Sequence, residues 1–165
     1  MQKSHNEGVL SLKEGILEIE KWTPQFINDQ LTDLLDSQPY LMGTLMEADE
    51  GIDEQAHQWM LKAALVLRWS FQKMGWRLTL LPQEKWHNLL EEKVALYEEH
   101  QEENGLDMPA LIKLSSSPNT LSELFLYVVE NNPVDQEAAG NLLFLMDCMV
   151  EGLEQAVLQD KNAEN

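Results

Sequence analysis

The most apolar stretch of the chain lies between Ile52 and Gly75. Its hydrophobic positions recur at the spacing of a helix, and leucine, valine and tryptophan side chains fill much of the other side as well. A helix that is apolar nearly all round is buried rather than half-exposed. The pattern therefore predicts a central helix over 52–75, with other helices packed around it.

A second long apolar pattern runs over 134–159, and we expect the two long helices to form the centre of the fold. Shorter helical patterns surround them, several of which begin at a capping residue or a proline. These helices are expected over 24–35, 39–46, 83–103, 108–114 and 118–130.

The segment 76–81 alternates like a strand, but we find no second strand to pair with it, so it is interpreted as an extended connector. The resulting prediction is an all-α bundle of about six or seven helices. It forms a single domain over 1–165, with polar ends at 1–8 and 161–165 that are expected to fray.

Two helical hairpins, 39–75 and 118–159, begin their long helices alike, with Asp-Glu-Gln-Ala and Asp-Gln-Glu-Ala. One interpretation is a weak internal duplication, because stacked repeats show similarity of this kind. The other is that any helical hairpin in an all-α protein has this pattern.

The chain is strongly acidic. Its 165 residues include 29 acidic and 11 basic side chains, for a formal net charge of −18. Such a charge repels phosphate backbones and anionic membrane surfaces, so nucleic acid and membranes are not expected partners. A basic partner, a cation and simple solubility remain as explanations. Neither a signal-peptide core nor an apolar run of bilayer length is found, so we expect a cytoplasmic protein.

Cys148 is the single cysteine of the chain. It lies among apolar residues of the second long helix, which predicts a buried and unreactive thiol.

Two Glu-x-x-His sequences, which end at His57 and His87, have the spacing used by di-iron sites in helical bundles. Both lie at the start of a helix, and antiparallel helices would hold them about 25 Å apart at 1.5 Å per residue. We therefore expect no shared metal site and no cofactor. The acidic stretch at 47–54 lacks the spacing of a calcium loop. The acidic face at 91–103 lacks the paired Glu-x-x-Glu and Glu-x-x-Asp helices with which all-α nucleotide pyrophosphohydrolases bind magnesium, and both stretches are interpreted as solvated faces.

Arg68 and Asp147 each interrupt the most apolar part of a long helix. A charge in such a place must be paired, reach water or face a cleft. One hypothesis is that the two side chains pair with each other across the core. The other is that they line a small pocket between the long helices and hold a ligand.

Five tryptophans and eight methionines are spaced mostly as core residues. The exception is the connector and the helix start that follows it, where we expect an exposed interaction surface and a homodimer through it. This surface comprises Trp76, Leu80, Leu81 and Trp86.

No phosphate-binding loop, nucleophile elbow or metalloprotease motif is present in the sequence. The favoured interpretation is an acidic helical module without catalytic activity that interacts with or regulates another protein. The alternative is a metal-dependent or small-molecule-binding helical enzyme that uses the acidic faces near His57 or His100. A deep polar pocket would favour the enzyme, and a large exposed apolar patch would favour the interaction module.

Overall fold

The described part of the chain is mostly helical, with no strand among its residues. The computed structural model describes residues 12–48, 51–104 and 107–163, and residues 12–20 form its first helix. The later helices are α2 (Pro24–Ser37), α3 (Pro39–Glu47), α4 (Glu54–Lys73), α5 (Gln83–Asn104), α6 (Met108–Lys113), α7 (Pro118–Asn131) and α8 (Gln136–Ala163). The predicted all-α fold is confirmed, although the described residues form eight helices rather than six or seven.

Side-chain caps explain where several helices begin. The Thr23 hydroxyl accepts a hydrogen bond from the Phe26 amide at 3.1 Å, just before the proline that opens α2. Asp53 caps α4 in the same way, accepting from the Ala56 amide at 2.7 Å. Each cap satisfies an amide that has no partner within its own helix. The sequence therefore fixes these boundaries locally.

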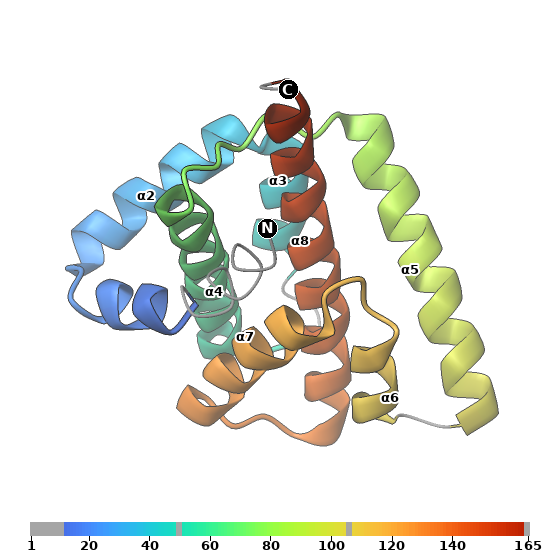
Figure 1. Cartoon of the computed structure of the whole chain (residues 1–165). Coiled ribbons are helices and arrows are strands. Elements are labelled where there is room, and N and C mark those ends of the chain that lie inside the picture. The colour runs from blue at the N-terminus through green and yellow to red at the C-terminus, as the bar shows by residue number, and fades with distance from the viewer. Residues whose placement is uncertain (1–11, 49–50, 105–106, 164–165) are drawn as a thin grey trace.

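Helix α8 lies in the middle of the bundle and contacts α3, α4, α5, α6 and α7. Helix α4 packs against α2, α7 and α8, whereas α5 stands at the edge of the molecule, where its main neighbours are α3 and α8 (Figure 1). The prediction that the two long helices form the centre is confirmed for α4 and α8.

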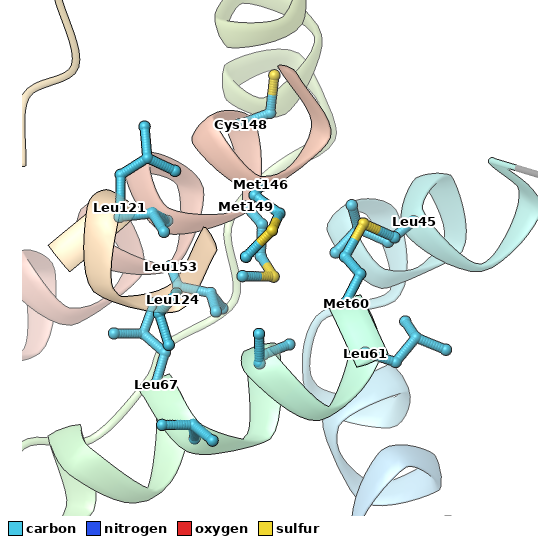
Figure 2. Packing of buried hydrophobic residues seen from close by; sticks show 14 of the residues in the cluster. Leu45, Met60, Leu61, Leu67, Leu121, Leu124, Met146, Cys148, Met149 and Leu153 are labelled. Atoms are coloured by element: carbon cyan, nitrogen blue, oxygen red, sulfur yellow. The ribbon is translucent and has the colours of Figure 1, made fainter. Parts of the chain in front are cut away.

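The core between α4 and α8 is filled by leucine and methionine side chains (Figure 2). Met146 and Met149 point from α8 towards α4, and Met60 lies beside Leu45 of α3. Cys148 points to a different side of α8 from Met149, and it is also fully buried. Because one face of α8 meets α4 while another meets α5, the helix is buried on both sides.

The connector 76–82 is extended, as predicted, and a buried glutamine holds it in place. Gln38, between α2 and α3, donates to the Thr79 carbonyl at 2.6 Å and accepts from the Leu81 amide at 3.0 Å. The Thr79 hydroxyl donates to the Ala156 carbonyl of α8 at 2.8 Å. The connector is therefore fixed between α3 and α8 rather than left on the surface.

This path corrects the predicted interaction surface. Leu81 and Trp86 are each only 1% exposed, Trp76 is half-buried, and Leu80 alone is exposed, at 50%. The segment does not present the whole apolar surface on which a homodimer was expected, because Leu81 and Trp86 enter the core.

The ends of the chain differ from the expectation where they are described. Residues 161–163 continue α8, while 164–165 and the predicted frayed segment 1–8 lie outside the described residues.

Among the helices described, none combines the length and apolar character needed to cross a bilayer.

Candidate functional site

Arg68 and Asp147 do not pair with each other, which corrects the first hypothesis about these charges. The Arg68 guanidinium donates to Asp33 Oδ2 at 2.8 Å and to the Gln30 side chain, both on α2. Asp147 instead faces α5. The physical reason is that α2 covers the side of α4 that carries Arg68, while α5 covers the side of α8 that carries Asp147.

A buried polar cluster joins α5 to α8. The Lys93 ammonium lies 3.2 and 3.1 Å from the two carboxylate oxygens of Asp147, and 2.5 Å from Oε2 of Glu151. The Tyr97 hydroxyl donates to Asp147 Oδ2 at 3.0 Å. Asp147 is fully buried and Lys93 is 5% exposed. Positions 93 and 97, like 147 and 151, are four apart, so each pair lies on one face of its helix.

Two of these groups keep their protons at neutral pH. Burial alone would lower the pKa of Lys93, but the hydrogen bond to Glu151 and the charges of Asp147 and Glu151 together raise it above its ordinary value. Burial, followed by the Asp147 charge, raises the pKa of Tyr97. Lys93 therefore stays a cation and Tyr97 stays a neutral donor, and neither is a base or nucleophile.

A hollow of about 310 Å³ opens beside this cluster, between α5 and α8. Its α5 wall consists of Val94, Tyr97, Glu98 and Gln101, and its α8 wall of Glu137, Gly140, Asn141 and Phe144. The rings of Tyr97 and Phe144 meet edge to face, with centroids 5.2 Å apart. Since Tyr97 also holds Asp147, the hollow and the buried cluster share a side chain.

The hollow suits a positive charge. Its two carboxylates, Glu98 and Glu137, are exposed, and none of its lining residues is basic. The half-buried rings of Tyr97 and Phe144 offer faces that attract cations. Asn141 is already held, because its side-chain amide donates to the Gly51 carbonyl at 3.2 Å. The chemistry favours an ammonium or guanidinium group over an anion.

The histidines do not assemble a metal site in the described part of the chain. His57 Nε2 lies 2.7 Å from the Leu45 carbonyl, a bond that ties α4 to α3, and His87 is exposed. The first turns of α4 and α5 lie at opposite ends of the molecule (Figure 1). Among the described residues, no three histidine, cysteine, aspartate or glutamate side chains are grouped to hold a metal ion. His100 differs, because its Nε2 atom is buried and has no hydrogen-bond partner among the described residues.

The sequence pattern did not single out Lys93, Tyr97 or Glu151 as functional residues. A signal was available in the apolar stripe of α5, which runs through Trp86 and Leu89 and then meets a lysine at the next turn. A cation in that place indicates a buried carboxylate opposite, and Asp147 was already singled out as a buried charge.

Comparison with protein-family models, with curated proteins and with solved structures found no match for the chain.

Proposed function

We propose that this protein is an acidic helical module without catalytic activity, which binds a basic segment of another protein in the hollow between α5 and α8. The observation that supports this proposal is the composition of the hollow. Two aromatic rings and two carboxylates line it, no basic side chain does, and the whole chain carries a charge of −18.

The size of the hollow favours a single long side chain as the group that enters. Ligand pockets for drug-sized molecules span about 300–1,000 Å³, and this one is at the lower limit. A lysine or arginine side chain would place its charge between Glu98 and Glu137 and over an aromatic ring. A cation–π contact contributes about 0.5–2 kcal/mol, depending on how far the site is desolvated. The acidic surface would speed association with a basic partner.

The test is a titration with peptides that carry one central lysine or arginine within a neutral sequence, followed by calorimetry. We expect binding to the wild-type protein, with Glu98→Gln and Glu137→Gln together weakening it about tenfold or more. The matched control is Glu91→Gln with Glu92→Gln, which removes the same charge from exposed positions of α5 outside the hollow.

Three outcomes separate the possibilities in this titration. A larger loss in the hollow variant than in the control supports the site. Equal losses would show that net charge alone attracts the peptide. No binding by the wild-type protein to either peptide would contradict the proposal.

A second candidate function, a small-molecule-binding enzyme, keeps one observation in its favour. His100 precedes Gln101 of the hollow wall, and its Nε2 atom is buried without a hydrogen-bond partner in the described part of the chain. His57 is not part of this candidate site, because its Nε2 atom already lies 2.7 Å from the Leu45 carbonyl. A screen of small amines against the wild-type protein and His100→Gln distinguishes the two functions, because only the enzyme candidate requires a His100-dependent ligand.

The proposal includes two further expectations, one on the location of the protein and one on the origin of its two hairpins. A cytoplasmic location is supported by the buried free thiol of Cys148. An internal duplication of the hairpins is supported by equivalent caps, since Asp135 accepts from the Ala138 amide at 2.8 Å as Asp53 accepts from Ala56.

A further inference from the structure

The two halves of α5 are attached to the bundle by different kinds of contact. In the first half, Trp86 and Leu89 are buried, and the Trp86 indole donates to the Thr44 hydroxyl at 2.9 Å. The Trp86 ring also lies so close to Gly152 that an added Cβ there would come within 2.9 Å of it. This half is held by apolar packing and one hydrogen bond to α3.

The second half of α5 has less packing of this kind. From Glu91 to Gln101, Lys93 is the only buried residue, Val94 is 43% exposed, and Tyr97 is a partly buried side chain that packs against the core. Its contacts with α8 include the ion pairs of Lys93 and the hydrogen bond and ring contact of Tyr97. The second half is therefore attached mainly through the buried polar cluster.

A contact made mainly of buried charges stabilises the fold less than apolar packing of the same area does. Two charges taken out of water lose hydration, which offsets most of their mutual attraction, and apolar side chains of the same size often hold as well or better. Opening of this contact would return Lys93, Asp147 and Glu151 to water. The hydration that these charges regain offsets much of the attraction that is lost. Segments with few buried apolar contacts are the ones that open locally while the rest stays folded.

We propose that residues 93–104 of α5 form an arm that opens from α8 at the Lys93–Asp147 cluster, while Trp86 keeps the first half of the helix in place. Four of the eight residues that line the hollow belong to this arm. Opening therefore widens the hollow, and a partner that needs more room than one side chain binds the open form and increases its population. This consequence for the partner rests on the proposed function, whereas the opening itself does not.

The experiment is amide hydrogen exchange on the full chain without any peptide. In the wild-type protein, amides of the arm should exchange about tenfold or more faster than those around Trp86. Lys93→Met leaves Asp147 buried without its cation, so it should release the arm further while α4 keeps its protection. Lys93→Met, Tyr97→Phe, Asp147→Leu and Glu151→Leu together make the contact apolar, because Glu151 would otherwise stay without its cation, and they should slow exchange in the arm to the wild-type rate or below.

Uniform exchange along α5 in the wild-type protein would overturn the proposal, as would a loss of protection in Lys93→Met that is equal in the arm and in α4. If Lys93→Met does not fold, Tyr97→Phe replaces it, because this change removes one hydrogen bond and leaves no buried charge without its partner. For Tyr97→Phe, the same two results would overturn the proposal. A peptide titration that fails while the arm exchanges as expected would contradict the proposed function alone.

Discussion

Lys93 and Asp147 form an ion pair inside the protein, with Nζ of the lysine 3.1 Å from Oδ2 of the aspartate. Their side chains are only 6% and 0% exposed, so water screens the pair little. The pair joins α5 to α8 next to the hollow, and it takes the place of the Arg68–Asp147 pair that the sequence indicated.

A double-mutant cycle checks this pair. Lys93→Met and Asp147→Leu should each lower the free energy of unfolding, and their coupling energy should exceed about 1 kcal/mol, as for charged neighbours. Lys93→Met should cost more, because it leaves Asp147 with only the Tyr97 hydroxyl, whereas Asp147→Leu leaves Lys93 paired with Glu151. Urea unfolding measures both effects.

The control cycle combines Arg68→Met with Asp147→Leu. Because Arg68 bonds to α2, these effects should add to within about 0.5 kcal/mol. Coupling in the control cycle and additivity in the first cycle would contradict the contacts described.

Glu154 makes stability depend on pH. Burial raises the pKa of this carboxyl, and although hydrogen bonds from the Ser117 and Ser116 hydroxyls oppose the shift, the pKa stays above its ordinary value. A raised carboxyl pKa means that the folded state disfavours the charge. The penalty is absent below the unfolded pKa, about 4.3, and grows as the pH rises towards the folded pKa.

Glu154→Gln should therefore raise the melting temperature at pH 7, and the gain should disappear near pH 4. Thermal unfolding at a series of pH values measures it. Glu91→Gln is the matched control, since it removes one charge from an exposed position. If the two variants gain equally at pH 7, relief of the overall negative charge explains the effect and burial of Glu154 does not.

Gly152 lets α8 approach its neighbours closely. A Cβ at this position would lie 2.6 Å from Leu41 Cδ1 and 2.9 Å from the Trp86 ring. Gly152→Ala should destabilise the protein by about 1–3 kcal/mol, the usual cost of overpacking, and should alter Trp86 fluorescence.

Gly43, within α3, is the matched control, because a Cβ there meets nothing within 4 Å. Gly43→Ala should stabilise by about 0.5–1 kcal/mol, since alanine loses less backbone entropy in a helix. If both changes stabilise the protein, the Trp86 ring can move away from a Cβ at position 152 at little cost in free energy.

Cys148 should react slowly with thiol reagents. Burial and then the Asp147 charge raise the pKa of this thiol, and the side chain is fully buried. Only the exposed thiolate attacks, so the folded protein should react at least about a hundredfold more slowly than the protein in urea. Equal rates with a disulfide reagent at pH 8 would show that Cys148 is accessible in the folded state.

Helix positions could be predicted because they depend on neighbours along the chain. The caps at Thr23 and Asp53 and the prolines that open α2, α3 and α7 act within a few residues of themselves. The exposed surface predicted around Trp86 was wrong, because a buried Gln38 more than forty residues away fixes the connector that leads to it.

The hollow and the cluster could not be predicted in the same way. Each consists of residues from α5 and α8 that are far apart in the sequence, such as Lys93 and Asp147 at 54 positions, and no local pattern says which faces of these helices meet. The sequence marked Asp147 as a charge that must be paired, reach water or face a cleft, and the partner predicted for it was Arg68 on α4, whereas the structure pairs it with Lys93 on α5.

The sequence by itself determined the helices, the apolar faces of α4 and α8, and the requirement that the charges of Arg68 and Asp147 be paired, reach water or face a cleft. These follow from backbone hydrogen bonding, helical periodicity and the cost of an unpaired buried charge. The tertiary structure alone decided that α2 supplies the partner of Arg68 and α5 that of Asp147. A helix presents several faces at once, and only the packing of the whole bundle determines which neighbour covers each of them.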